Sequence, residues 1–492
     1  MFAKRIISVY NSEVIVNKIA ESKMEASVKM NFHTQICAST NLQVAKGMET
    51  IMKKMKKVLS LVLAGVMALM LVACGNTDTA NGSDNGSANE SGAEVNANVS
   101  NIKIGAVMLG DETEGYTKAH MDGIKAAAAA LGIPDSQIVW KYKVKEDSGC
   151  YDAAVDLVAQ GCNLIISNSY GHQTYMVQAA EEYPDVTFIA MTGDFAAICG
   201  LPNFKNAFTA VYESRYVSGV VAGMKLKELL DDGTVTAENM PNSFDADGNV
   251  KIGYVGAFNY AEVVSGYTAF YLGVKSIVPN VVMEVMYTNS WFDIDKEGAA
   301  AEALVANGSV IVCQHADSTG APAAVQKLQD NGTVCYSVGY NIDMLETAPT
   351  AALTSATNNW SAYYKHAFET FMNGGEIESD WAKGYSDDAV AITTLGPSCA
   401  EGTAEKVAEV EEALRNGSMH VFDTSTFTVG GETVTSATVD LSFMDWSTMT
   451  AIYQGETVEA IENGYFAEST FRSAPYFALR IDGITEDADP VQ

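Results

Sequence analysis

Aromatic side chains recur in this sequence beside amide, carboxylate, hydroxyl or imidazole groups, each time shortly after an apolar run. The residues in question are Tyr116, His120, Asn168, Ser169, Tyr170, Phe258, Trp291, His315, Asp317, Asn341 and Asp343. Aromatic rings stack on flat ligands, which contributes about 1–3 kcal/mol per nucleic-acid base. Amide and carboxylate groups match the donors and acceptors on the edge of a heterocycle or a ribose. These residues therefore predict a binding site for a flat small molecule with polar edges.

Other kinds of chemistry find little support in the same residues. His315, Asp317 and Ser318 are too close in sequence to form a hydrolase triad, and the chain has no GxSxG motif. His120, His172 and His315 lack the HxH or HExxH spacing of a metal site. Lysine and arginine are scarce in these loops, and no P-loop or GxGxxG opens a helix, which disfavours a phosphorylated ligand. We expect a protein that is not an enzyme and that uses no cofactor or metal.

Each of these aromatic residues also has a purely structural interpretation. Tyr116, Tyr170 and Trp291 are compatible with ordinary packing of loops against a core. Arg215 is compatible with a place in the binding site, but we favour an ion pair at the start of a helix.

The elements that must position these residues alternate between strand and helix. The expected strands are 102–109, 137–142, 163–166, 186–190 and 208–211, then 250–255, 281–287, 309–313, 333–338 and 351–355. The expected helices include 123–131, 151–160, 174–182, 217–230, 263–277, 296–306, 321–329 and 363–372. Near-continuous apolar strands alternating with helices are typical of parallel sheets covered on both faces. Ligands bind beyond the carboxyl ends of such strands, where the aromatic and polar residues lie.

A break rich in Gly, Asp, Asn and Pro at 231–249 separates two such series, so we expect an α/β protein with two doubly wound lobes. We assign 101–211 plus 351–395 to the first lobe, and 212–350 plus 396–492 to the second. The pattern changes after Gly396, where a charged helix at 404–415 precedes a region with a hairpin turn at Gly430 and Gly431. We therefore expect an extra C-terminal region.

The N-terminal part has the pattern of a bacterial lipoprotein leader. Lysines precede an apolar run that stops at Leu-Val-Ala and Cys74, so residues 52–73 read as a signal peptide and Cys74 as the lipidated residue. A short membrane anchor that is never cut is the alternative. Residues 74–100 are nearly devoid of apolar side chains and predict a flexible tether. Residues 1–51 precede a complete leader, and we interpret them as a non-native extension.

The charge balance excludes one class of partner. The 492 residues include 30 basic and 61 acidic side chains, a net charge of −31, which argues against binding nucleic acid. Six cysteines lie beyond Cys74, and an exported protein could pair them. Because several lie in or beside apolar runs and no CxxC occurs, we favour mostly buried free thiols.

Five segments together resemble the basic membrane protein family of substrate-binding lipoproteins for ABC importers, which includes purine-nucleoside receptors. They are 212–223, 252–257, 289–293 with Lys296 and Glu297 following, 314–318, and 359–364. The similarity extends over about 102–396. It implies a type I periplasmic-binding fold in which two lobes, joined by three crossovers, close on a purine nucleoside or base.

The resemblance also implies roles for individual residues. The family's first-loop aromatic role falls on Tyr116, with Asp111 or His120 nearby, and its second-lobe aromatic falls on Trp291. The family's ribose-binding Asp corresponds to Asn341 in this chain, and Asp343 lies two residues further along. Its lysine falls near Asn358. These departures weaken the expected ribose contacts, so a free base such as adenine fits as well as a nucleoside.

We therefore expect a monomeric, lipid-anchored receptor on the extracytoplasmic face of a cell membrane. It would capture a purine nucleoside or nucleobase in the interlobe cleft and deliver it to an ABC permease. A receptor of the same fold for riboflavin or a sugar is one alternative. A surface adhesin or structural lipoprotein, suggested by the extra acidic C-terminal region, is another.

Overall fold

The computed structural model describes residues 98–445 and 448–487, all of which belong to one unit, Gly92–Gln492. The expected N-terminal extension, the leader with Cys74 and nearly all of the tether lie outside these residues. Within the described part of the chain, no helix is long and apolar enough to cross a membrane.

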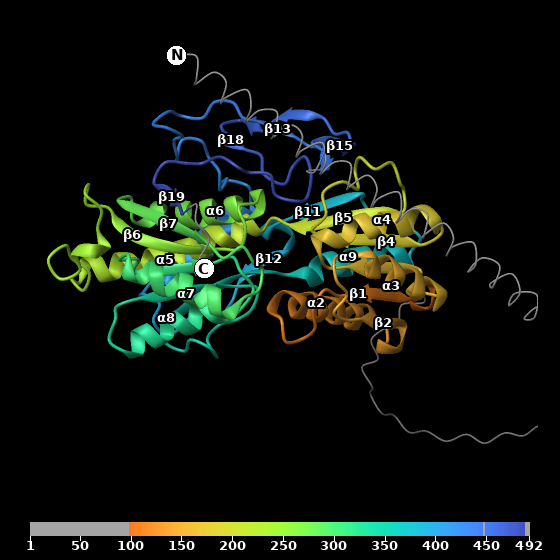
Figure 1. Cartoon of the computed structure of the whole chain (residues 1–492), viewed down its shortest axis with the longest axis horizontal. Coiled ribbons are helices and arrows are strands. Elements are labelled where there is room, and N and C mark those ends of the chain that lie inside the picture. The colour runs from red at the N-terminus through yellow and green to blue at the C-terminus, as the bar shows by residue number, and fades with distance from the viewer. Residues whose placement is uncertain (1–97, 446–447, 488–492) are drawn as a thin grey trace, which may run out of the picture. The chain divides into compact units, whose positions relative to one another are not determined.

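The first lobe is built on a parallel sheet (Figure 1). Among the described residues its spatial order is β11 (Asp380–Lys383), β5 (Phe204–Thr209), β4 (Thr187–Met191), β3 (Leu164–Ser167), β1 (Ile104–Val107) and β2 (Ile138–Lys141). The four residues of β1 are all buried, as expected for a strand covered on both faces.

Four helices cover the two faces of this sheet. They are α2 (Gly115–Leu131) and α9 (Trp360–Met372) on one face, and α3 (Ser148–Ala159) and α4 (Gln173–Glu182) on the other. Successive side chains of a strand point to opposite faces. Accordingly, Ile104 packs in the core with α2 and α9, whereas Val107 packs in the core with α3 and α4.

The second lobe repeats this arrangement around another sheet. Among the described residues its order is β12 (Val390–Ile392), β10 (Ala352–Asn358), β9 (Tyr336–Tyr340), β8 (Ile311–Gln314), β6 (Val250–Gly256), β7 (Val281–Tyr287) and β19 (Ile484–Glu486). Of these neighbours, β10 and β12 are antiparallel and the others parallel. The expectation of two doubly wound α/β lobes is confirmed.

The covering helices of the second lobe are α5 (Val211–Asp231) and α6 (Ala261–Ile277) on one face, and α7 (Ile294–Ala306) and α8 (Gly320–Asp330) on the other. Glycine permits close contact between α5 and α6. A Cβ atom on Gly219 would lie 2.1 Å from the carbonyl oxygen of Phe270, and one on Gly273 would lie 2.1 Å from that of Tyr216. The small residues of the 212–223 segment thus have a packing role.

The expected assignment of 351–395 to the first lobe is wrong in part. β10 pairs with β9 of the second sheet, and β12 pairs with β10, so both belong to the second lobe. Of this segment, only α9 and β11 belong to the first lobe: α9 packs against α2, and β11 pairs with β5. The sequence of an apolar strand does not show which sheet the strand joins, because tertiary pairing decides this. The chain therefore crosses between lobes after β5, after β10 and after β11, which gives the three crossovers that the resemblance implied.

Some element boundaries also differ from expectation. β5 begins at Phe204, whereas the expected strand began at 208. The later start was expected because the polar residues Lys205 and Asn206, which are buried in the structure, interrupt the apolar run. α2 begins at Gly115, inside the polar loop, because the Glu114 carboxylate accepts hydrogen bonds from the backbone N–H groups of Tyr116 and Thr117. This is ordinary N-capping by a side-chain oxygen.

The C-terminal region continues beyond β12 with α10 (Thr403–Arg415) and a series of short strands. These are β13 (Thr438–Asp440), β14 (Phe443–Asp445), β15 (Thr450–Tyr453), β16 (Thr457–Glu459), β17 (Ile461–Glu462) and β18 (Tyr465–Phe466). We call residues 422–487 the C-terminal extension. The expected turn at Gly430 and Gly431 is present, with positive φ at both residues and an antiparallel bridge between Val429 and Glu432.

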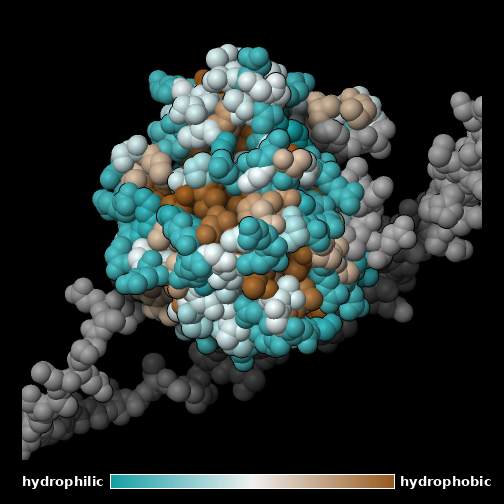
Figure 2. Space-filling view, turned by 90° about the vertical axis from the view of Figure 1, so that its left-hand side faces the viewer, coloured by the Kyte–Doolittle hydropathy of each residue, from teal (hydrophilic) through white to brown (hydrophobic). Residues whose placement is uncertain are grey.

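Hydrophilic side chains cover much of the face shown in Figure 2, with hydrophobic patches between them. Such a mixture is ordinary for a folded domain. The cysteines of the described residues are free thiols, of which Cys150, Cys162, Cys313 and Cys335 are buried.

Candidate ligand-binding site

The loops at the strand ends of the two lobes meet each other. A Cβ atom on Gly115, in the first turn of α2, would lie 3.4 Å from the backbone oxygen of Asp317 and 3.5 Å from Cδ1 of Ile342. Next to a crossover, the Thr209 hydroxyl donates a hydrogen bond to Oδ1 of Asn358. The first turn of α2 therefore faces the loops that follow β8 and β9.

An aromatic group occupies the second-lobe side of this contact. We define the second-lobe aromatic group as Phe258, Tyr260, Trp291, His315 and Tyr340. Ring centroids are 5.5 Å apart for Phe258 and Trp291, 6.3 Å for Trp291 and His315, and 5.0 Å for His315 and Tyr340. Phe258 and Trp291 are partly exposed, and Tyr260 is 58% exposed. The predicted residues Phe258, Trp291 and His315 thus lie together.

His315 lies at the buried end of this group. Its Nδ1 is 3.1 Å from the Tyr254 hydroxyl, and its Nε2 is 3.3 Å from Oε1 of Glu262. Burial, together with the nearby Arg215 guanidinium, holds the pKa of His315 well below its usual value, so the imidazole is neutral at pH 7. Burial raises the pKa of Glu262 to about 7, and Arg215 opposes that rise.

Arg215 is fully buried beneath the same group. Its Nη1 donates a 2.6 Å hydrogen bond to the carbonyl oxygen of Gln314, and its guanidinium carbon lies 3.7 Å from the centroid of the Tyr340 ring. Within the described residues its Nε and Nη2 have no hydrogen-bond partner and it forms no ion pair. The expected ion pair at a helix start is therefore wrong. Arg215 is held by a cation–π contact and a carbonyl oxygen.

Asp317 and Asn341 form a second polar group at these strand ends. Nδ2 of Asn341 donates a 2.7 Å hydrogen bond to Oδ1 of Asp317, and Nδ2 of Asn358 lies 3.4 Å from Oδ1 of Asn341. Burial, with carboxylates nearby, raises the pKa of Asp317 well above its usual value. Asp343 is exposed, and its Oδ1 accepts a 2.8 Å hydrogen bond from the backbone N–H of Leu345. The structure thus places Asp343 in a turn that faces solvent.

Glu297 ties together the loops that carry Trp291 and Asp317. This buried carboxylate accepts hydrogen bonds from the backbone N–H of Asp293 at 3.0 Å and from that of Ser318 at 3.2 Å. Burial raises its pKa to about 7. A signal existed in the sequence: Glu297 shares the buried face of α7 with Ala300, Ala301 and Leu304, where a carboxylate needs a specific partner.

The predicted residues of the first lobe have a different setting. His120 is buried, with Nδ1 2.6 Å from the Tyr364 hydroxyl and its ring stacked on Trp360 at 4.1 Å. Burial lowers its pKa to about 3. Its ring also lies 4.6 Å from that of Tyr116. His120 therefore packs α2 against α9.

Asn168 and Tyr116 bond to each other and to the first lobe. The Tyr116 hydroxyl donates a 2.5 Å hydrogen bond to the Asn168 carbonyl oxygen. Oδ1 of Asn168 accepts from the Leu109 N–H at 2.8 Å, and its Nδ2 donates to the Thr117 hydroxyl at 3.2 Å. Burial raises the pKa of Tyr116 well above its usual value, with Glu262 of the second lobe contributing. Tyr116 is therefore close to the second-lobe polar groups, whereas the Asn168 side chain is committed to its own lobe.

Ser169 and Tyr170 point to other partners. The Ser169 hydroxyl donates a 2.5 Å hydrogen bond to Oε1 of Glu146. Tyr170 is 46% exposed, and its hydroxyl donates a 3.0 Å hydrogen bond to Oδ2 of Asp194, which Arg472 approaches at 3.7 Å. The structure thus joins Tyr170 to the C-terminal extension.

Residues 108–421 match the family described as ABC transporter substrate-binding proteins like PnrA, named Bmp. The chain belongs to the Bmp family. Members are extracytoplasmic, non-enzymatic carriers that bind small molecules and deliver them to a permease. The C-terminal extension begins where the match ends.

Two curated relatives are similar to this Bmp protein. A purine-binding protein of Brucella abortus is 29% identical over 324 residues, which is 65% of this chain and 83% of that protein. A candidate ABC transporter glucose-binding protein of Haloferax volcanii is 30% identical over 271 residues, 55% of this chain and 61% of that protein.

Solved structures share the fold at low identity. A solute-binding protein of an ABC transporter from Conexibacter woesei has a TM-score of 0.51 at 18% identity, covering 65% of this chain and 98% of its own. A transcriptional activator from Bacillus halodurans also has a TM-score of 0.51 at 18% identity, covering 64% and 99%. One fold thus serves transport and regulation, so function must be argued from the site.

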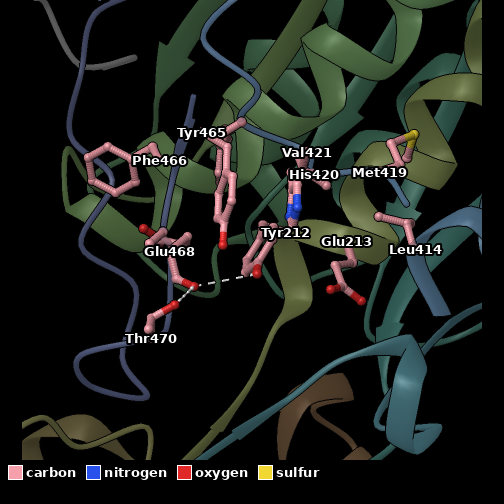
Figure 3. Close-up of a pocket in the computed structure, with 12 residues that line it drawn as sticks. Tyr212, Glu213, Leu414, Met419, His420, Val421, Tyr465, Phe466, Glu468 and Thr470 are labelled. Atoms are coloured by element: carbon pink, nitrogen blue, oxygen red, sulfur yellow. Dashed lines mark hydrogen bonds between the residues drawn. The ribbon is translucent and has the colours of Figure 1, made fainter. Parts of the chain in front are cut away.

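A separate pocket lies beside the first turn of α5 (Figure 3). Its volume is about 160 Å³, and its walls come from the start of α5, the end of α10, residues 419–421 and the C-terminal extension. Inside it the rings of His420 and Tyr465 stack at 3.7 Å, and the Tyr212 hydroxyl points to the carbonyl oxygen of Glu468 at 3.5 Å. A second cavity of about 330 Å³ lies between β11 and residues 469–473. None of the residues predicted from the sequence lines either cavity.

Proposed function

We propose that this Bmp protein captures a purine nucleoside or nucleobase between its two lobes and delivers it to an ABC permease. The observation that carries the proposal is the second-lobe aromatic group, in which Phe258 and Trp291 are partly exposed at the strand ends and which is backed by Arg215 and Glu262. Aromatic faces bind flat rings. The purine ligand named for the Brucella abortus relative supports the same class.

The protonation states of the buried groups suit a purine edge. A purine presents both donors and acceptors along its edge. With their raised pKa values, Asp317 and Glu262 can carry a proton, so that each carboxyl group donates as well as accepts. Neutral His315 has one donor and one acceptor nitrogen, which lie beside the Tyr254 hydroxyl and the Glu262 carboxyl group, so its tautomer sets which of these partners donates. We assign Trp291 and Phe258 to stacking, and Tyr116, His315, Asp317 and Asn341 to the polar contacts.

In this proposal the lobes rotate about the three crossovers and close on the ligand, with no bond made or broken. The protein acts as a monomer, held at the extracytoplasmic face of the membrane by a lipid on Cys74, and the permease is its macromolecular partner. Cys74 lies outside the described residues, so mass spectrometry of the membrane-extracted protein is the measurement for the anchor. An acyl-modified N-terminal peptide beginning at Cys74 is the expected result.

The test of the ligand class combines mass spectrometry and calorimetry. Ligand released from freshly purified protein is identified first, and the emptied protein is then titrated with adenosine, guanosine, inosine, adenine, riboflavin and glucose. Binding of at least one purine, competed by the co-purified ligand, is expected. Heat from glucose or riboflavin together with silence from every purine would overturn the proposal.

A sugar receptor is the second function we consider, because the similar Haloferax volcanii protein is described as glucose-binding. Aromatic side chains also pack against sugar rings, but a sugar needs hydroxyl partners around its whole rim. The glucose arm of the titration distinguishes the two functions directly.

A further inference from the structure

The C-terminal extension contacts both lobes through one short stretch of chain. Arg472 and Ser473 reach the first lobe: Nη1 of Arg472 lies 3.7 Å from Oδ2 of Asp194, and the Ser473 N–H donates a 3.0 Å hydrogen bond to Oδ2 of Asp380. The side chains of Arg472 and Asp194 are only 16% and 11% exposed. Water therefore screens this pair less than an exposed pair.

The same stretch is anchored in the second lobe a few residues later. Arg480 donates a hydrogen bond through Nη2 to Oδ1 of Asn259, in the loop between Phe258 and Tyr260. β19 then joins the second sheet as an edge strand beside β7, in parallel register (Figure 1). Oε1 of Glu486 accepts a 2.8 Å hydrogen bond from the Tyr267 hydroxyl of α6.

The chain between these two anchors is itself well held. Ala474, Tyr476 and Phe477 are buried, and the Phe477 ring stacks on Phe422 at 4.2 Å. The Tyr476 N–H donates a 3.0 Å hydrogen bond to the Glu468 carboxylate. From Ser473 to Arg480 the chain can span at most about 25 Å even if fully extended. A separation of its two anchors beyond that span would therefore release one of them.

A second contact holds the extension on the first lobe. Phe443 and Tyr453, on the paired strands β14 and β15, lie 4.6 Å and 4.9 Å from the Phe195 ring, in the loop after β4. The extension also contacts the first turn of α5, where the Tyr212 hydroxyl meets the Glu468 carbonyl oxygen (Figure 3). Rotation of one lobe against the other must strain or break some of these contacts.

We propose that residues 472–486 form a strap between the lobes, in which Arg472 and Arg480 are positioning residues that limit how far the lobes separate. Arg472 holds Asp194, the partner of Tyr170, and Arg480 holds the loop that carries Phe258 and Tyr260. The strap thereby adds to the cost of lobe opening and keeps the strand-end loops of both lobes near one another.

The experiment measures the distance between the lobes and needs no ligand, so its outcome is independent of the proposed function. Spectroscopic labels on encoded keto amino acids at Ala130 of α2 and Ala299 of α7, both exposed, avoid the native thiols. Arg472→Gln and Arg480→Gln are combined in one variant. The population with separated lobes is expected to rise about threefold to tenfold, because the variant loses the partly buried Arg472–Asp194 ion pair and the more exposed contacts of Arg480 with Asn259 and Glu486. The thermal midpoint should fall by only a few degrees.

Two further variants make the result decisive. Lys406→Gln removes an exposed ion pair with Glu409 inside α10 and should leave the distance distribution unchanged. Arg472→Lys with Arg480→Lys keeps both charges and should restore part of the wild-type distribution. If the glutamine variant has the wild-type distribution, the strap proposal is wrong, whether or not its thermal midpoint falls. An equal shift in the Lys406→Gln variant would overturn it as well.

Discussion

The two lobes bring similar residue types to the same interface but use them differently. In the first lobe, the polar side chains of His120, Asn168 and Ser169 bond to groups of that lobe. In the second lobe, Trp291 and Phe258 remain partly exposed, and Arg215 keeps polar atoms without partners among the described residues. A polar residue after a parallel strand can therefore serve either to hold the loop or to face a ligand. The difference lies in whether its hydrogen bonds are already satisfied.

Removing the second-lobe indole should have the largest effect on binding. Trp291→Ala is expected to weaken binding of the purine identified by titration about 10- to 100-fold, because a stacking face is lost. Isothermal titration measures the affinity, and thermal unfolding should change little because the indole is partly exposed. Phe292→Ala is the matched control, since this neighbour is 44% exposed. Equal affinity in Trp291→Ala and wild type would remove Trp291 from the site.

Removing a first-lobe amide should instead affect stability. Asn168→Ala is expected to lower the free energy of unfolding by about 2 kcal/mol, because the partly buried Leu109 N–H and the buried Thr117 hydroxyl each lose a partner. Urea denaturation measures this, while ligand affinity per folded molecule should stay the same. Asn331→Ala, at an exposed helix end, should change stability by less than about 0.5 kcal/mol. A weakened affinity with unchanged stability would show that Asn168 faces the ligand after all.

The buried Glu297 should make second-lobe stability depend on pH. Its folded pKa of about 7 exceeds the ordinary 4.5, so its stabilising contribution is complete below about pH 4.5 and is lost as pH rises through about 7. His120 acts in the opposite direction, because its folded pKa of about 3 lies below 6.5. The difference in unfolding free energy between wild type and Glu297→Gln isolates the carboxyl group. Between pH 5 and 7.5 the wild type should lose about 2 to 2.5 kcal/mol of unfolding free energy relative to Glu297→Gln. A pH-independent difference would contradict the raised pKa.

Asp343 provides the smallest expected effect. Its carboxylate faces solvent and bonds the Leu345 N–H in a turn, so Asp343→Ala should change stability by less than about 0.5 kcal/mol and leave binding unaltered. Titration of this variant beside Trp291→Ala measures both. A loss of affinity approaching that of Trp291→Ala would return Asp343 to the site.

Much of the fold could be predicted because alternating apolar runs and helices are local patterns. β6, β7 and α6 lie close to the expected ranges. The placement of β10 could not be predicted, since its apolar residues suit either sheet and only its pairing with β9 decides. At the site, the predicted residues Phe258 and Trp291, which follow β6 and β7, lie with ring centroids 5.5 Å apart. The sequence indicated no role for Glu262 and favoured an ion pair at a helix start for Arg215, because a charge that is buried in the fold looks like a surface charge in the sequence.

The amino-acid sequence by itself determined the alternation of strand and helix, the acidic charge balance and the family, because each depends on residue types and their spacing along the chain. Only the tertiary structure decided which strand-end residues are satisfied within one lobe and which face the other. It also decided that residues 472–486 join the two lobes. Both outcomes depend on contacts between segments far apart in sequence, such as Arg472 with Asp194 and Arg215 with Tyr340. The spacing of residues along the chain does not reveal such contacts.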